Sequence, residues 1–265
     1  MEVEAPTRAR LTARSVLAST LLGVHPPELP TRSLVATARL LGVSDGSART
    51  AISRMVAAGE LEATGSGYRL AGPALLARQS RQDLSRAGVD EPWDGTWRTE
   101  VVTAETRSAA DRADLRIALT ALRHAELREG VWLRPRNLPS GVLRDTERTV
   151  RAQCRALDAW PVDDPAALAA ELWPLDAWAA TARSLHEELS ALHERLAAGD
   201  TDALAEGFVS AAHALRHFQA DPLLPPELLP ADWPGPNLRA EYEAFDRRFK
   251  QTLAAWQRSI QPAVG

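Results

Sequence analysis

The residues best suited to chemistry in this sequence lie between positions 44 and 58. Helical geometry, at about 100° per residue, gives this segment a polar face of small hydroxyl and arginine side chains: Ser47, Thr50, Ser53 and Arg54. The only carboxylate of the segment is Asp45, at its start. Short donors and arginines read base edges in a DNA major groove, where carboxylates would repel the phosphates. The face indicates DNA binding, and the alternative is a solvated surface helix of an unrelated helical domain.

The opposite face of the segment is apolar, with the spacing i, i+4, i+7, i+8: Ala48, Ile52, Met55 and Val56. This stripe predicts a helix packed against a core. Ser44 is a suitable N-cap for a helix from Asp45 to about Ala58, which Gly59 would end. Arg49 lies near the edge of the stripe, so we expect it to grip the DNA backbone or pair internally rather than read a base.

The elements around this helix follow a recognisable order. An amphipathic helix is expected at 14–23, and a second at 34–41, capped by Thr31 or Ser33 and ended by Gly42. After the third helix, "ELEATGSGYRLAG" alternates around Gly65-Ser66-Gly67, which predicts a β-hairpin. Three helices and a hairpin form a winged helix-turn-helix, in which flanking arginines would hold phosphates: Arg14, Arg32, Arg49 and Arg69.

Charge is distributed unevenly along the 265 residues. The net charge is −4, yet residues 1–80 hold nine arginines against six acidic residues, a balance of +3. The remainder holds 22 basic against 29 acidic residues, a balance of −7. A basic module on an acidic body is consistent with a DNA-binding head.

The rest of the chain predicts two further blocks. The middle block reads as a strand, a helix, a strand, a weakly helical stretch and a last strand, at 96–104, 108–125, 130–135, 139–148 and 149–157. This order suggests a ferredoxin-like α+β unit. Three helical periods follow, at 176–200, 202–220 and 237–259. The expected fold is a multidomain α+β protein with these parts: a winged-helix domain at 1–80, a linker at 81–92, a ferredoxin-like domain at 93–162 and a helical C-terminal domain at 163–265.

Four residues outside the head are candidates for contacts with a small-molecule effector: Trp132, Arg134, Arg136 and His213. The two guanidinium groups suit a phosphate or an acidic partner, or else they pair with the surplus Asp and Glu. His213 and His217 are four apart, a spacing that can bind zinc. No third ligand is evident, so the alternative is that they pack or lie on the surface, and we expect neither metal nor cofactor.

Four stretches resemble the PaaX-type bacterial transcriptional repressors, named for control of phenylacetate degradation genes. They are "LGVSDGSARTAISRMVAAGEL", "WDGTWR" at 93–98, "GVWLRPRNL" at 130–138 and "FQADPLLPPELLPADWPG" at 218–235. The resemblance implies the three-domain fold above and a homodimer on double-stranded operator DNA. It also implies a repressor released by an effector such as an aromatic acyl-CoA. The sequence departs from the family in its wing, "ATGSGYRL", where Arg69 is the lone arginine.

Other classes of function are weaker alternatives. A metal-dependent nuclease on the ferredoxin-like unit needs clustered carboxylates, but the first strand ends without an aspartate and Glu105 is the nearest carboxylate. A partner-binding scaffold is the other alternative. No apolar run approaches bilayer length, the N-terminus lacks a secretory pattern, and Cys154 is the only cysteine. We therefore expect a cytoplasmic, non-enzymatic protein without membrane association or an intrachain disulfide.

Overall fold

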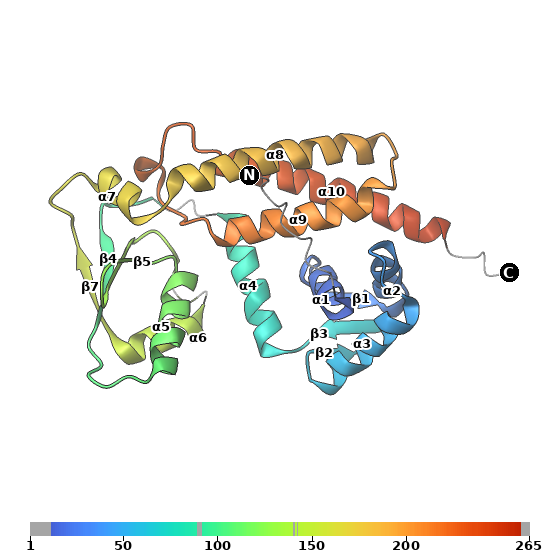
Figure 1. Cartoon of the computed structure of the whole chain (residues 1–265), viewed down its shortest axis with the longest axis horizontal. Helices are drawn as coiled ribbons and strands as arrows, with labels where there is room; N and C mark the ends of the chain where they lie inside the picture. The colour runs from blue at the N-terminus through green and yellow to red at the C-terminus, as the bar shows by residue number, and fades with distance from the viewer. Residues whose placement is uncertain (1–11, 89–91, 140, 142, 261–265) are drawn as a thin grey trace, which may run out of the picture. The chain divides into compact units, whose positions relative to one another are not determined.

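The computed structural model describes residues 12–88, 92–139, 141 and 143–260 (Figure 1). The chain divides into two compact units. The first comprises Met1–Gln79, Leu196–Phe208 and Phe249–Gly265, and the second comprises Ser80–Arg195 and Val209–Arg248. Residues 1–11, where we expected no targeting signal, and 89–91 of the expected linker lie outside the described residues.

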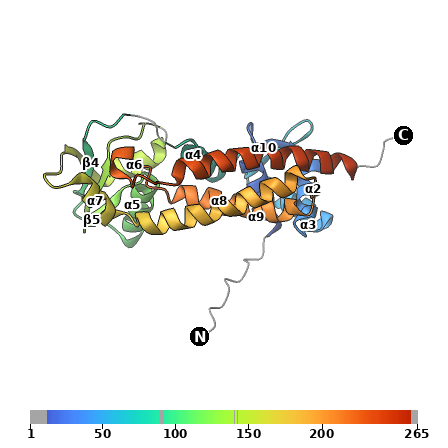
Figure 2. The same cartoon turned by 90° about the horizontal axis from the view of Figure 1, so that it is seen from above.

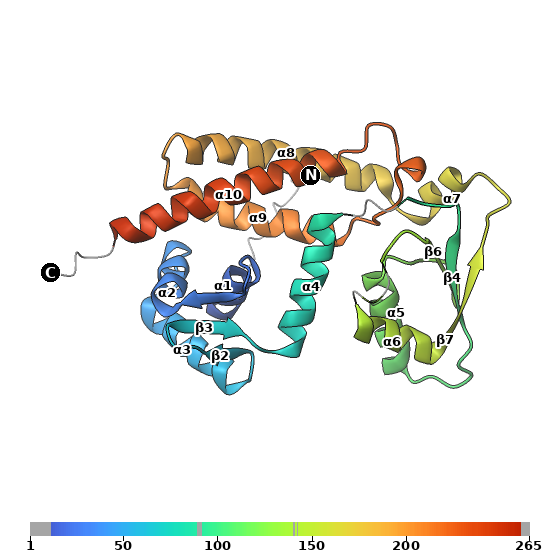
Figure 3. The same cartoon turned by 180° about the vertical axis from the view of Figure 1, so that it is seen from behind.

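Between residues 12 and 72, the first unit contains three helices (Figure 3) and a small antiparallel sheet with the order β1-β3-β2. The elements are α1 (Ala13–Leu22), β1 (Glu28–Pro30), α2 (Thr31–Leu40), α3 (Asp45–Ala57), β2 (Leu61–Ala63) and β3 (Gly67–Leu70). The expected hairpin is present as β2 and β3. Sequence reasoning missed β1, which pairs with β3 along three residues. Gly67 permits this pairing, because a Cβ there would lie 2.0 Å from the carbonyl oxygen of Leu29.

The boundaries of α3 are those that the sequence predicted. The Ser44 side chain accepts a hydrogen bond from the backbone N–H of Ser47 at 3.2 Å. Gly42 and Gly59 adopt φ values of +79° and +69°, which end α2 and α3. The expected cap of α2 was wrong: this helix starts at Thr31 without a side-chain cap, because strand β1 leads into it directly through Pro30.

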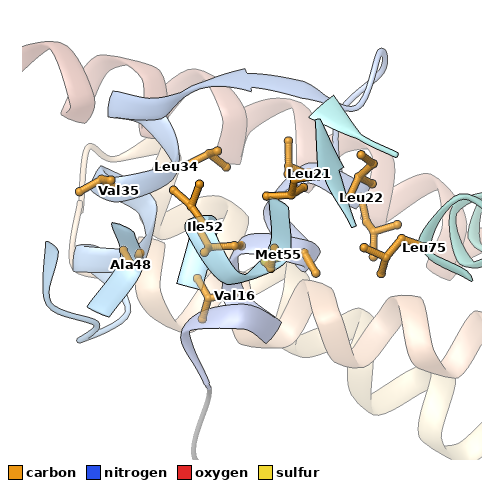
Figure 4. Packing of buried hydrophobic residues seen from close by; sticks show 14 residues of the cluster. Val16, Leu21, Leu22, Leu34, Val35, Ala48, Ile52, Met55 and Leu75 are labelled. Carbon is orange, nitrogen blue, oxygen red and sulfur yellow. The ribbon is translucent and has the colours of Figure 1, made fainter. Parts of the chain in front are cut away.

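The core of the first unit lies between α1, α2 and α3 (Figure 4). Ala48, Ile52 and Met55 are almost completely buried, which confirms most of the predicted stripe. Val56 was wrongly included, since its side chain is 38% exposed. At 100° per residue the buried stripe is centred between Ile52 and Met55, and Ala51 and Val56 lie on its two flanks. Of these two flanks, the one with Ala51 packs against the core.

The second unit contains a four-stranded antiparallel sheet with the order β5-β6-β4-β7. Its elements are β4 (Trp97–Val102), α5 (Ala109–Ala121), β5 (Ala125–Arg128), β6 (Val131–Pro135), α6 (Arg144–Gln153) and β7 (Cys154–Ala159). The chain order β-α-β-β-α-β with this strand order is the ferredoxin-like arrangement that we expected. Residues of α5 and α6 pack on Trp132 of the sheet.

Two expectations for this unit were wrong. The segment 149–157 was expected to be a strand, but α6 continues through Gln153 and only β7 is extended. Val150 fits a helix because it is buried against α5, and two ion pairs along α6, Arg148–Asp145 and Arg151–Glu147, support the helical turn. The helix expected at 108–125 stops at Ala121, and strand β5 was missed.

The remaining helices include the three that the sequence predicted at 176–200, 202–220 and 237–259. They are α4 (Pro73–Ala87), α7 (Pro165–Leu172), α8 (Leu175–Ala197), α9 (Ala203–Gln219), the 3-10 turn η1 (Pro226–Leu228) and α10 (Gly235–Ser259). Within the second unit, α8, α9 and α10 run side by side (Figure 2). Residues 81–87, expected to be linker, belong to α4. Among the described helices, none is both long and apolar enough to cross a membrane.

Candidate nucleic-acid interface

The outer face of α3 presents the polar side chains that the sequence predicted. Ser47, Arg49, Thr50, Ser53 and Arg54 are all exposed. The hydroxyls of the serines form hydrogen bonds within the α3 segment. Those of Ser44 and Ser47 bond to each other at 2.9 Å, and the Ser53 hydroxyl donates to the Arg49 carbonyl at 3.1 Å. The side chains most available to a ligand are therefore Thr50, Arg49 and Arg54.

The arginines around this face differ in how their charge is compensated. Arg14 forms an ion pair with Glu60, with Nε 2.9 Å from Oε2, and Arg69 pairs with Glu62 at 2.8 Å. Both hydrogen-bonded carboxylates raise the pKa of their arginine. Within residues 12–88, Arg32 and Arg54 have no ion pair. Of the predicted phosphate contacts, Arg14 and Arg69 are therefore already paired, whereas Arg32 is not.

The lone carboxylate of α3 is neutralised by a residue that sequence reasoning missed. Arg39, in the last turn of α2, donates to both oxygens of Asp45, at 2.9 and 2.5 Å. This bond is the main reason that the pKa of Asp45 lies below its ordinary value, and Arg49 lowers it further. A basic residue closing α2 opposite an acid opening α3 is the sequence signal that was available.

Three of the four candidate effector residues lie on or directly after β6, and the fourth, His213, lies on α9. Trp132 is buried under α5, with the Arg116 guanidinium 5.3 Å from its ring centre. His213 is exposed on α9. Arg136 forms an ion pair with Asp158, with Nη1 3.8 Å from Oδ2. This is the pairing with an acidic residue that the sequence offered as an alternative. Among the described residues no hydrogen bond or ring contact joins any two members of this set.

Arg134 is fully buried and its guanidinium is occupied. It donates to the carbonyls of Pro135 and Leu122 at 2.7 and 2.8 Å and to Oδ1 of Asn137 at 2.5 Å. Burial, with a smaller effect of nearby Arg123, lowers the pKa of Arg134 to about 9. The side chain acts as a structural crosslink, and the geometry gives no support to a ligand-binding role.

A second buried polar cluster was also missed by sequence reasoning. The Arg123 guanidinium donates to Ser85 Oγ at 2.6 Å and to the Gln219 carbonyl. Arg239 donates to the Ser85 carbonyl and, at 2.7 Å, to Asp221. Asp221 belongs to the segment "FQADPLL". This network ties α4, α5, α9 and α10 together inside the second unit.

The residues weighed for metal chemistry do not converge in the described part of the chain. No group of three or more His, Cys, Asp or Glu side chains there is placed to hold a metal ion. His217 stacks on Trp178 with ring centres 4.4 Å apart, and its Nε2 lies 3.1 Å from the Trp178 carbonyl. It is a packing histidine. Glu105 is exposed.

Comparison with known proteins gives three family matches in chain order. The model of the PaaX-like protein matches residues 12–74, that of the PaaX protein central Cas2-like domain matches 90–157, and that of the PaaX-like protein C-terminal domain matches 173–259. A solved structure, of the uncharacterized protein Rv0674 from Mycobacterium tuberculosis, is 41% identical, with a TM-score of 0.72. The match covers 93% of this chain and 99% of that one. No curated protein matches the chain significantly.

Proposed function

Because this chain belongs to the PaaX-like family of transcriptional regulators, we propose that its first unit is a winged-helix head that binds operator DNA through α3. The observation that carries the proposal is the outer face of α3. This face is exposed, it carries Thr50 and Arg54, and its one carboxylate is neutralised by Arg39. A helix in a major groove needs such donors and no free negative charge.

The proposed contacts follow from the availability of each side chain. Arg54 and Thr50 approach base edges, while Arg32 and Arg49 hold phosphates. Arg14 and Arg69 contribute less, because a phosphate would have to replace Glu60 or Glu62 as their partner. Three serines hold or flank the reading face and contact the backbone of the DNA at most: Ser44, Ser47 and Ser53.

The remaining features of the proposal come from the family resemblance. Two copies of the chain would bind a two-fold operator in the cytoplasm and repress the genes behind it. An effector such as an aromatic acyl-CoA would release the DNA. Such an effector must bind the DNA-free form more tightly than the DNA-bound form, since only a difference in affinity shifts the equilibrium.

The proposal is tested by titrating a fluorescent fragment of the region upstream of the protein's own gene. A scrambled fragment of equal length and composition is the control, at one fixed salt concentration. Specific regulators typically prefer their sites by about a thousandfold or more. Equal affinity for the two fragments would instead support the scaffold alternative.

A further inference from the structure

A groove of about 490 Å³ lies between α4 and α10 in the second unit. Six residues line it: Asp83, Arg86, Ala87, Arg239, Ala240 and Glu243. Its volume falls in the range of about 300–1,000 Å³ in which proteins bind small molecules. The lining combines guanidinium groups with the methyl groups of two alanines, so the groove suits a ligand that is both charged and partly apolar.

Arg239 is held firmly in the groove, and one of its nitrogens is left over. Its Nε and Nη2 donate to the carbonyl of Ser85 at 3.2 and 3.1 Å, and Nη2 also donates to Oδ2 of Asp221 at 2.7 Å. All its hydrogen bonds to described residues come from these two nitrogens. Nη1 is therefore available to a ligand, on a side chain whose position is fixed before the ligand arrives.

The groove lies beside an excess of buried positive charge. Arg123 donates to the hydroxyl of Ser85, the residue whose carbonyl accepts from Arg239. Both guanidiniums have the buried carboxylate of Asp221 as their acidic neighbour. Burial, with Arg239 and Arg81 adding to it, lowers the pKa of Arg123 to about 10 even though Asp221 raises it. Because uncompensated buried charge is unfavourable, an anion beside Arg239 would be stabilised there.

The second guanidinium of the groove is paired, but its partner can be replaced. Arg86 donates to Oε1 of Glu243 at 2.7 Å and lies 3.5 Å from Oδ2 of Asp246. The side chain of Glu243 is 44% exposed, whereas that of Asp246 is 14% exposed. If Glu243 turned into the solvent, Arg86 would keep Asp246. An incoming anion can thus take the place of Glu243 without first leaving Arg86 unpaired.

We propose that this groove binds a small organic molecule through a carboxylate or phosphate group held by Arg239 and Arg86. Guanidinium groups bind both kinds of oxyanion through paired, charge-assisted hydrogen bonds. Ala87 and Ala240 line the same groove and contact the apolar part of the molecule. Glu243 competes with the ligand for Arg86.

The bound molecule acts on α4, because Arg239 also holds the carbonyl of Ser85 in the last turn of that helix. Helix α4 begins at Pro73 in the first unit and continues from Ser80 in the second. A ligand that draws Arg239 towards itself weakens this anchor. Any consequence for operator affinity rests on the proposed function, whereas binding in the groove does not. The experiments below are therefore done without DNA.

Binding is measured by isothermal titration calorimetry on the full-length chain. Inorganic pyrophosphate is the phosphate probe and benzoate the organic carboxylate probe, with potassium chloride at equal ionic strength as the control. At least one probe is expected to bind with a Kd of about 1 mM or lower, and a preference between them identifies the kind of oxyanion. If neither probe binds more tightly than chloride, the proposal is overturned.

The place of binding is tested by filling the groove. Ala87→Leu adds bulk at an exposed position and leaves every arginine in place. It is expected to weaken probe binding by about tenfold, because the added side chain occupies the space of the ligand. Ala180→Leu, at an exposed position on α8, is the matched control and should bind as the wild type does. Equal affinities in Ala87→Leu and the wild type would contradict the proposed place.

The charges are tested by two substitutions with opposite expected effects. Arg239→Gln should weaken probe binding by about tenfold or more, whereas Glu243→Gln should strengthen it about threefold, since it removes the competing carboxylate. Arg216→Gln and Glu187→Gln, exposed on α9 and α8, make the same changes of net charge and should have little effect. Changes of equal size in these controls, or none in the groove variants, would refute the site. Circular dichroism checks the fold, and if Arg239→Gln unfolds, Glu243→Gln and Ala87→Leu decide. Probe binding by a chain that shows no operator preference would remove only the proposed DNA binding.

Discussion

The guanidinium of Arg39 donates two hydrogen bonds to the carboxylate of Asp45, from Nε to Oδ1 at 2.9 Å and from Nη2 to Oδ2 at 2.5 Å. Arg39 closes α2 and Asp45 opens α3, so the pair spans the turn between the two helices. It fixes the start of α3 and removes the negative charge from the face proposed to bind DNA.

Arg39→Ala is therefore expected to weaken operator binding by about fivefold, because Asp45 becomes an uncompensated charge near phosphates. The overall fold should be retained, since both side chains are exposed. Fluorescence anisotropy at fixed salt measures the effect. The double variant Arg39→Ala/Asp45→Asn, which removes both charges, should recover most of the affinity. An affinity of Arg39→Ala equal to that of the wild type would show that the pair has no part in binding.

His124 is expected to make the protein acid-sensitive. Burial, with Arg134 and Arg98 adding to it, lowers the pKa of His124 from 6.5 to about 3. Between pH 6.5 and pH 3, His124 binds a proton in the unfolded chain but stays neutral in the folded chain. The free energy of unfolding therefore falls as the pH drops from 6.5 towards 3, by about 1.4 kcal/mol per pH unit.

Urea unfolding at pH 7 and pH 5 measures this contribution. The wild type should lose about 2 kcal/mol more than His124→Leu over this interval, since the variant lacks the titrating group. His213→Leu, at an exposed position on α9, should lose as much as the wild type. Equal losses in wild type and His124→Leu would mean that His124 is protonated in the folded protein.

The two arginines of "WLRPR" should differ sharply in their effect on stability. Arg134→Ala leaves the buried carbonyl of Leu122 and the Asn137 amide oxygen without their donor, so a loss of about 3 kcal/mol is expected. Arg136→Ala breaks an exposed ion pair and should cost less than about 1 kcal/mol. Urea unfolding at pH 7 compares the two variants. If both variants lost less than about 1 kcal/mol of unfolding free energy, Arg134 would not be a structural crosslink and would again be a candidate for ligand binding.

Local signals made α3 predictable from the sequence. The Ser44 cap, the positive-φ glycines and the buried Ala48 and Ile52 depend on neighbours within a few residues. Val56 was misplaced because the centre of the buried stripe also depends on which helices pack against α3. The α6 segment was misread for a similar reason: the alternation around Val150 fits a strand or a helix, and its packing against α5 decides between them.

Partners that lie far apart in the sequence could not be predicted from it. Arg14 and Glu60 are 46 positions apart, and Ser85 meets Arg239 from 154 positions away. Such pairs form only once the fold brings distant helices together. The same holds for Arg134, whose hydrogen bonds to the Leu122 carbonyl and to Asn137 form only in the folded chain.

The central claim is that α3 reads the operator, and Arg54 tests it most directly. Arg54→Ala is compared with Arg148→Ala, another exposed arginine, which lies on α6 in the second unit. Anisotropy titrations use the upstream fragment and its scrambled control at one salt concentration. If Arg54 contacts a base, Arg54→Ala should lose about 1–3 kcal/mol of binding free energy on the operator alone. Arg148→Ala should bind as the wild type does. Undiminished operator preference in Arg54→Ala would contradict the claim that Arg54 on α3 reads the operator.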